Sequence, residues 1–203
     1  MKIEYYQNFE KELKAGLKKQ ASLSVKHFVS SFESNDEIEK WVWEYLPKLE
    51  KNRHSCIRHE LFVNLVYPTL KNGFYSEDYN STLWLGKLIQ NIYQTGKLFE
   101  ELGGLCEIDF YRKCYEIDPT QSEASKLLLV SLLNWFSYCE HEWPSGILYG
   151  NNGATIEQCE EIRDEVQFAL TLPVEAQDKE FIAGFLTKLS EYEARLNKRI
   201  NAD

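Results

Sequence analysis

The sequence predicts an all-α protein in which helical hairpins pack around a buried central helix, in a single domain of residues 1–203. Apolar residues recur at spacings of three and four along almost the whole chain, and the strict alternation of a half-buried strand is nearly absent. The chain has 203 residues, which is one domain's length and enough to bury a core without a disulfide or metal.

Each expected helix carries an apolar stripe. Ser34 and Glu37 form a capping box at the start of the third helix, because hydroxyl and carboxylate can each satisfy a free backbone N–H. Pro47 is expected to kink or break that helix, and Pro68 to limit the next one. The expected helices lie at about residues 3–17, 21–33, 34–49, 55–66, 79–94, 106–116, 120–141, 155–169 and 178–200.

The helix at 120–141 is the expected centre of the fold. Thr120 and Glu123 form a second capping box, and the string SKLLLVSLLNWFSYC follows. After its lysine, the only polar residues of this string are Ser131, Asn134 and Ser137, spaced by three. A helix that is apolar nearly all round is buried by neighbours on several sides.

The net charge of −9 is unevenly distributed. Residues 1–71 hold 12 Lys and Arg against 10 Asp and Glu, whereas residues 72–203 hold 11 against 22. Duplex-binding proteins need basic surface to displace counterions, so the sequence argues against nucleic acid as a partner. The acidity suits a basic protein partner, or serves solubility alone.

Cysteine usage and the N-terminal residues bear on compartment and cofactors. The five cysteines are odd in number, widely spaced and without a C-x-x-C pair, so neither a disulfide framework nor a zinc site is indicated. The first residues are acidic where a signal peptide has an apolar core, and no apolar run approaches the roughly 20 residues of a membrane span. We therefore expect a cytoplasmic protein without membrane, metal or cofactor.

One stretch resembles a known repeat family. Residues 111–124, YRKCYEIDPTQSEA, resemble the junction between two tetratricopeptide repeats, where a second helix ends at a proline and the next unit follows. Tyr111 and Cys114 match the bulky and small positions of that helix. The resemblance implies helical-hairpin architecture and a protein-binding role. No 34-residue self-similarity accompanies it.

Two further strings resemble sequences of uncharacterised bacterial proteins of similar length. They are RHELF at residues 58–62 and HEWPSGILYG at residues 141–150. That group has no established activity, so the resemblance implies no mechanism. In size, acidity and helical character the chain is also similar to some immunity proteins that neutralise secreted toxins.

The first candidate site is the string RHSCIRHE at residues 53–60. Positive neighbours lower the pKa of a thiol, so Cys56 is either a reactive thiol or a buried structural cysteine. Arg53, His54 and Arg58 offer a third interpretation, an anion site at a helix start. His59 and Glu60 form a His-Glu pair that recurs at residues 141 and 142.

The second candidate site is the end of the central helix and the irregular segment at residues 141–154. Long loops in compact domains are often functional. If this site meets Arg58, His59 and Glu60, histidine and carboxylate form an acid–base or ligand-binding pocket. Otherwise the polar groups hold the helix end and loop together, with the tryptophan packed beneath. The candidate residues are Glu140, His141, Glu142, Trp143 and Tyr149.

An acidic helical face is the third candidate. It can present a negative patch to a basic protein or be merely solvated. The leading hypothesis is a non-catalytic interaction protein that binds through this acidic half or the 141–154 loop, for example an antitoxin-like inhibitor. The alternative is a small enzyme or ligand-binding protein with the His/Glu/Trp pocket. The face comprises Glu157, Glu160, Glu161, Asp164 and Glu165.

Overall fold

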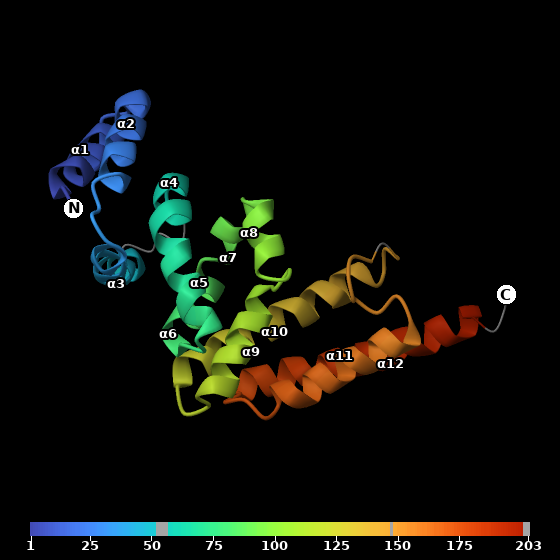
Figure 1. Cartoon of the computed structure of the whole chain (residues 1–203). Coiled ribbons are helices and arrows are strands. Elements are labelled where there is room, and N and C mark those ends of the chain that lie inside the picture. Colours follow the sequence, from blue (N-terminus) through green and yellow to red (C-terminus); the bar gives the residue numbers. More distant parts are fainter. Residues whose placement is uncertain (52–56, 147, 201–203) are drawn as a thin grey trace. The chain divides into compact units, whose positions relative to one another are not determined.

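The computed structural model describes residues 1–51, 57–146 and 148–200, and every regular element within these ranges is a helix (Figure 1). The predicted all-α class is confirmed. The chain divides into two compact units, residues 1–117 and 118–203, which are described separately below. The expectation that the chain acts as a single domain stays a prediction.

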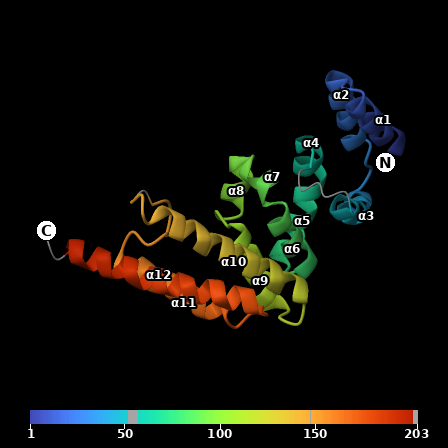
Figure 2. The same ribbon diagram turned by 180° about the vertical axis from the view of Figure 1, so that it is seen from behind.

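The N-terminal unit is built from short helices in chain order. Its first two helices form a hairpin and lie side by side in both ribbon views (Figures 1 and 2). The elements are α1 (Ile3–Lys14), α2 (Lys18–Val29), α3 (Asn35–Lys51), α4 (His59–Leu61), the π-helical turn η1 (Phe62–Val66), α5 (Tyr67–Tyr75), α6 (Tyr79–Lys87), α7 (Ile89–Tyr93), α8 (Gly96–Glu101) and α9 (Glu107–Ile117).

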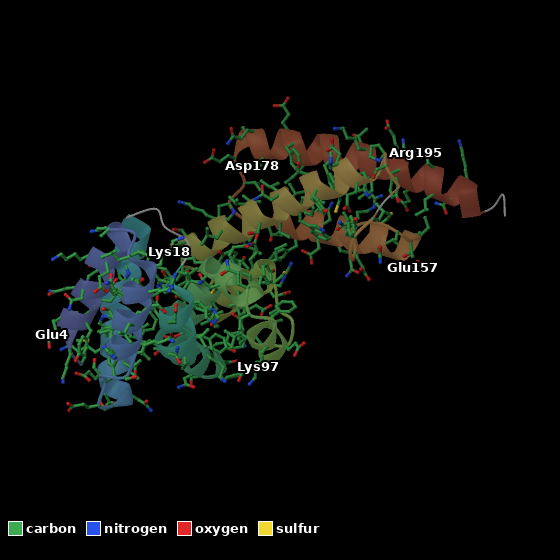
Figure 3. The ribbon with its side chains drawn as sticks, turned by 90° about the horizontal axis from the view of Figure 1, so that it is seen from above. Glu4, Lys18, Lys97, Glu157, Asp178 and Arg195 are labelled. Atoms are coloured by element: carbon green, nitrogen blue, oxygen red, sulfur yellow. The ribbon has the colours of Figure 1, made fainter. Side chains whose placement is uncertain are left out.

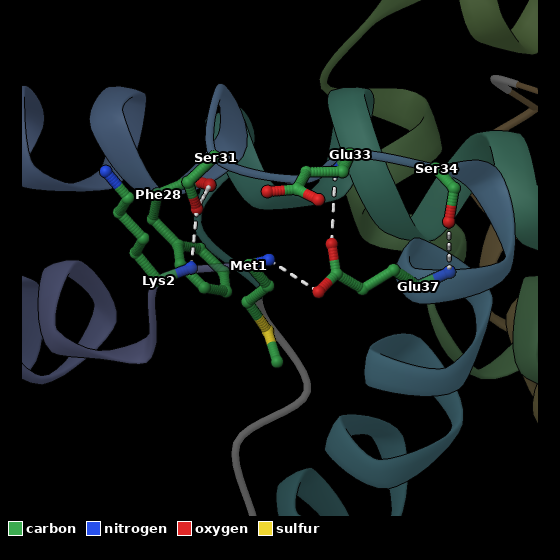
Figure 4. Close-up of polar contacts among 7 residues, drawn as sticks. All are labelled: Met1, Lys2, Phe28, Ser31, Glu33, Ser34 and Glu37. Atoms are coloured by element: carbon green, nitrogen blue, oxygen red, sulfur yellow. Dashed lines mark hydrogen bonds and ion pairs between the residues drawn. The ribbon is translucent and has the colours of Figure 1, made fainter.

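The start of α3 bears out the predicted capping box with one change. The Glu37 N–H donates to Ser34 Oγ over 3.2 Å, but the Glu37 carboxylate accepts from the Glu33 N–H, at 3.0 Å, instead of from Ser34 (Figure 4). The same carboxylate pairs with the Met1 amino group. Hydrogen bonds from that amino group and from Glu33 lower the pKa of Glu37. The N-terminus is thereby tied to the start of α3.

Both prolines of this unit lie inside helical segments, Pro47 within the expected 34–49 helix and Pro68 beyond the expected end of the 55–66 helix. Helix α3 continues past Pro47 to Lys51, and Pro68 is the second residue of α5. The helix expected to begin at 55 begins at His59 and continues through η1 and α5. The wider π-helical turn directly before Pro68 gives room for the ring that would otherwise clash with the preceding turn.

Close backbone contacts set the packing of α5, α6 and α9. A Cβ added at Gly73 would lie 2.0 Å from Ser81 Oγ, and one at Gly86 would lie 2.6 Å from the Tyr111 ring. Only glycine fits at these two crossings. The phenylalanine-rich core runs through the whole unit, and Phe28, Phe62 and Phe110 are among its fully buried members.

The C-terminal unit contains α10 (Ser122–Glu142), α11 (Ile156–Ala169) and α12 (Ala176–Ile200). Helix α10 packs on both others, and α11 and α12 lie side by side (Figure 2). The capping box predicted at Thr120 is wrong. Gln121 occupies the N-cap position without a side-chain cap, and both its Nε2 and the Thr120 hydroxyl donate to the Asp118 carboxylate instead.

Helix α10 is the core helix of this unit, yet it is not enclosed on all sides. Ser125 and Ser131 are buried, whereas Val130 and Tyr138 are 54% and 47% exposed. The expectation of a central helix buried all round is therefore wrong for one face. The small serines let neighbouring helices approach. Because the string is apolar on nearly every side, its composition did not indicate which side is exposed.

Two further expectations concern membranes and the repeat-like junction. Within the described residues, no helix is both long and apolar enough to span a bilayer. Helix α9 ends at Ile117, Pro119 follows, and α10 begins at Ser122. This is the local order that the tetratricopeptide resemblance implies, and kinship with that family stays a prediction. Charged side chains such as Glu4, Lys97 and Glu157 project from the helices (Figure 3).

Candidate functional site

Arg58, His59 and Glu60 lie at the start of α4 in the N-terminal unit. The Arg58 Nε atom pairs with Glu60 Oε2 at 2.9 Å, and the Ser22 hydroxyl donates to Glu60 Oε1 at 3.4 Å. Burial raises the pKa of Glu60, but hydrogen bonds and the Arg58 charge outweigh it and hold that pKa below its ordinary value. His59 is exposed. Arg53, His54 and Cys56 lie outside the described residues.

Glu142 is the most enclosed of the predicted site residues, with 5% of its surface exposed. Its Oε2 atom accepts hydrogen bonds from Asn152 Nδ2 at 2.7 Å and from the Tyr149 backbone N–H at 3.2 Å. Burial raises the pKa of Glu142, but these hydrogen bonds and one from Tyr138 lower it more. The carboxylate therefore holds the 141–154 segment against the end of α10.

Asn152 completes this network from the other side. Its Oδ1 atom accepts from Trp135 Nε1 at 2.8 Å and from Cys139 Sγ at 3.4 Å. Its backbone carbonyl accepts from Trp143 Nε1, also at 2.8 Å. Together with Glu142, these residues form a closed network in which each buried polar side chain has a partner.

Trp143 packs beneath the segment against α12. Its ring stacks on Tyr192, with centroids 4.9 Å apart, and the Tyr192 hydroxyl donates to the Gly153 carbonyl over 2.8 Å. Gly153 has φ +93°, and a Cβ there would lie 3.2 Å from Trp143 Nε1. Residues of the 141–154 segment therefore pack onto the buried side chains at the end of α10 and on α12.

The remaining predicted residues of this segment face solvent or pair locally. His141 is exposed, Tyr149 is 64% exposed, and Glu140 pairs with Lys188 of α12. The residues at 58–60 and at 140–149 belong to different units, so the shared His/Glu/Trp pocket stays a prediction.

The acidic face predicted on α11 is present as a surface stripe. Glu157, Glu160, Glu161 and Asp164 are exposed and follow the helical spacing of three and four, with Glu165 half-buried beside them. The arginine of this helix is engaged elsewhere, since Arg163 Nη2 pairs with Glu193 of α12 at 2.7 Å.

The N-terminal unit holds a groove that the sequence did not predict. It has a volume of about 810 Å³ and is bordered by α3 on one side and by η1, α5 and α6 on the other. In Figure 1, α3 is seen nearly end-on while α5 lies in the plane of view, so the two helices cross. The lining residues are Asn35, Ile38, Glu39, Trp43, Pro47, Asn64, Pro68, Thr69, Asn72, Gly73, Ser76, Asp78, Asn80, Ser81 and Trp84.

The groove combines two half-buried indoles, Trp43 and Trp84, with a set of amide and hydroxyl side chains. A few polar groups placed among aromatic walls are typical of ligand and peptide sites, and the volume lies within the usual range for such sites. In the part of the chain that the structure describes, the only charged residues lining the groove are the carboxylates Glu39 and Asp78. Asp78 also caps α6, accepting from the Ser81 N–H at 2.7 Å.

Both prolines of the unit line this groove, one on each wall. Proline has no N–H, so one carbonyl in the preceding turn loses its usual helical donor. In α3 that carbonyl belongs to Trp43, four residues before Pro47. On the other wall, Pro68 follows the turn η1, where Asn64 Nδ2 donates to the Glu60 carbonyl at 2.7 Å. Single π-helical turns are frequent at functional sites.

A sequence signal for the groove exists in hindsight. Trp43 and Pro47 are four residues apart, as are Asn64 and Pro68, so each pair lies on one helical face. The sequence predicts a kink or break at Pro47 and a limit to the next helix at Pro68, so this spacing was not recognised as a shared helical face. Asn152 and Trp135 of the closed network carried no local motif either.

Comparisons of the chain with protein-family models, with curated proteins and with solved structures gave no match. Within the described part of the chain, no three His, Cys, Asp or Glu side chains gather in a way that would hold a metal ion.

Proposed function

We propose that this chain is a non-catalytic interaction domain that binds a polypeptide partner in the groove between α3 and α5–α6. One observation carries the proposal: a groove of about 810 Å³ places two half-buried tryptophans among amide and hydroxyl side chains. Tryptophan combines a large apolar surface with a polar N–H and is enriched at the centres of protein interfaces.

The chemistry of the lining supports binding over catalysis. Among the described groove residues only Glu39 and Asp78 carry a charged side chain, and Asp78 already caps a helix. General acid–base and nucleophilic catalysis use a positioned histidine, cysteine, lysine or activated hydroxyl beside a base. The lining offers hydrogen bonds and aromatic surface, which suit recognition.

A display selection tests the proposal. The full chain is used to select from a library of random linear peptides, and the selected peptides are measured against Asn72→Arg, which fills the groove from an exposed position on α5. Asn8→Arg, exposed on α1, is the matched control for the added charge. We expect binding to wild type and to Asn8→Arg and loss with Asn72→Arg. Peptides that bind all three equally would contradict the groove as the docking surface.

The acidic stripe on α11 supports a second docking surface, for a basic protein. Its four exposed carboxylates follow one helical face, and the arginine of the helix is paired away from them. Such a surface raises association rates by electrostatic steering. Replacing Glu160 and Asp164 by lysine should abolish binding of a basic partner that docks here and leave groove-bound peptides unaffected.

A further inference from the structure

We propose that the occupant of the groove is an extended segment of the partner that carries a lysine or arginine side chain between Trp43 and Trp84. The inference rests on the proposed function and specifies its ligand. Four features of the groove support it: its carboxylates, its two tryptophan walls, its asparagine side chains and the backbone carbonyl of Trp43, which faces a proline without an N–H.

The charge of the groove favours a cation. Among the described residues its lining contains the carboxylates of Glu39 and Asp78 and no lysine, arginine or histidine. An acidic or phosphorylated segment would meet uncompensated carboxylates here, whereas a basic one finds a complementary field. Glu39 is exposed on α3, so its carboxylate is available to a ligand.

The indole walls suit the alkyl stem and charged head of the same side chain. Cations are attracted to the face of a tryptophan within about 6 Å of the ring centroid. Lys87 Nζ of the chain itself already lies 4.8 Å from the centroid of Trp84, so this indole accepts a cation contact, and a ligand cation must either displace Lys87 or use the Trp43 side of the groove. Trp43 is half-buried on the opposite wall.

Asparagine side chains in the groove suit an extended backbone, since a primary amide matches both the N–H and the C=O of a peptide unit. The fold contains such a pairing: Ile57 N–H donates to Asn91 Oδ1 at 3.2 Å, and Asn91 Nδ2 donates to the Ile57 carbonyl at 2.8 Å. In the described part of the chain, the exposed side chains of Asn35, Asn72 and Asn80 make no hydrogen bond.

The position of Pro47 adds an acceptor for the donors of such a ligand. Pro47 has no N–H to donate to the carbonyl of Trp43, four residues before it, and both residues line the groove. Backbone N–H groups and the ammonium or guanidinium of the ligand are the donors that would satisfy this oxygen.

A peptide array with one fixed central residue tests the inference. The probes are immobilised peptides of about ten residues, which reach about 30 Å when extended, with randomised flanks and Lys, Arg, Gln, Glu or Leu at the centre. We expect the full chain to prefer Lys and Arg. Glu39→Gln should weaken those peptides about two- to fivefold, whereas Glu44→Gln, exposed on α3 outside the lining, should not.

Two further measurements separate the parts of the recognition. Trp43→Leu should weaken binding of the basic peptides about two- to fivefold. Trp43→Phe should weaken their binding less, because a phenyl ring keeps part of the contact with the cation. Methylating single backbone nitrogens beside the central residue should weaken binding about two- to tenfold if those N–H groups are recognised.

The outcomes distinguish this inference from the proposed function. A groove-dependent preference for Glu, Gln or Leu at the central position, or binding that is indifferent to backbone methylation, overturns the extended basic ligand and leaves the interaction groove in place. Absence of any peptide whose binding is lost in Asn72→Arg overturns the proposed function itself. A basic preference that survives Asn72→Arg and Glu39→Gln places the binding outside the groove and overturns the inference.

Discussion

The closed network of the C-terminal unit and the groove of the N-terminal unit are built from the same residue types. Each combines two tryptophans with asparagine and acidic side chains: Trp135, Trp143, Asn152 and Glu142 in the network, and Trp43, Trp84, Asn72 and Glu39 among the groove residues. In the network, the polar side chains bond to one another and are buried. In the groove, Asn72 and Glu39 are exposed. The difference lies in whether these side chains already have partners within the fold.

That difference predicts opposite consequences for substitutions. Removing a member of the closed network leaves its buried neighbours without partners, so the loss falls on the free energy of unfolding. Removing an exposed groove residue leaves nothing unsatisfied within the chain, so the loss falls on binding. The following substitutions test this contrast, from the largest expected effect to the smallest.

Asn152→Ala should have the largest effect. It removes the donor to Glu142 and the acceptor of Trp135 and Cys139, and we expect a loss of about 2–4 kcal/mol in the free energy of unfolding. Urea unfolding followed by tryptophan fluorescence measures it. Asn151→Ala, the exposed neighbour, is the control and should change little. Equal effects of the two would show that the network does not stabilise the unit.

Gly73→Ala tests the groove wall instead of its ligand side chains. The new Cβ would lie 2.0 Å from Ser81 Oγ and 2.5 Å from Ser81 Cβ, so α5 and α6 must move apart, at a cost of about 1–3 kcal/mol. Gly184→Ala in α12, where a Cβ meets nothing within 4 Å, is the matched control. That control should be stabilising by about 0.5–1 kcal/mol, because alanine favours helix. Thermal unfolding monitored by circular dichroism compares the two, and a stabilising Gly73→Ala would contradict the tight crossing.

Acidification tests the charge in the closed network. The hydrogen bonds of Glu142 outweigh its burial and lower its pKa in the folded state, so the folded protein binds the proton less readily than the unfolded chain. The resulting stability is present above the unfolded pKa of about 4.3. It is lost as pH falls through the lower folded pKa.

Glu142→Gln should therefore be less stable than wild type at neutral pH, with a difference that narrows as the pH falls. Urea unfolding at several pH values measures this difference. Glu191→Gln, exposed on α12, is the control and should follow the wild-type profile. We expect a smaller effect than that of Asn152→Ala because glutamine keeps the shape of the side chain. A difference that is constant with pH would show that Glu142 contributes through shape alone.

Local spacing was enough to predict the fold class, which is confirmed, whereas the candidate sites depend on contacts between helices and stay predictions. Apolar spacing of three and four marked α2, α9, α11 and α12 because each buries one face, and this physics is local to the helix. The helical segment around Pro68 is longer than expected because a π-helical turn joins α4 to α5, and α3 continues through Pro47 to Lys51. Neither feature leaves a local pattern.

The predicted site residues show the same limit. The sequence left two roles open for Glu142 and Trp143, an acid–base or ligand pocket, or anchoring of the helix end and loop. The structure gives them the hydrogen-bond and stacking partners of the second role, within the 141–154 segment and α12. Their partner Asn152 lies ten residues beyond Glu142, and the spacing alone does not reveal the pairing. The groove residues come from α3, η1, α5, α6 and the turn before α6, so only the assembled unit brings them together.

Asn72→Ala should have the smallest effect on stability, and it is the most direct test of the contrast. Asn72 is exposed in the groove and its side chain supports no other residue in the described part of the chain, so we expect a change within about 0.5 kcal/mol in urea unfolding. Binding of basic extended peptides should nevertheless weaken, measured by fluorescence anisotropy with a labelled peptide. A loss of stability comparable to that of Asn152→Ala would show that Asn72 stabilises the fold, as Asn152 does in the closed network. That result would contradict the proposal that the groove is a recognition surface.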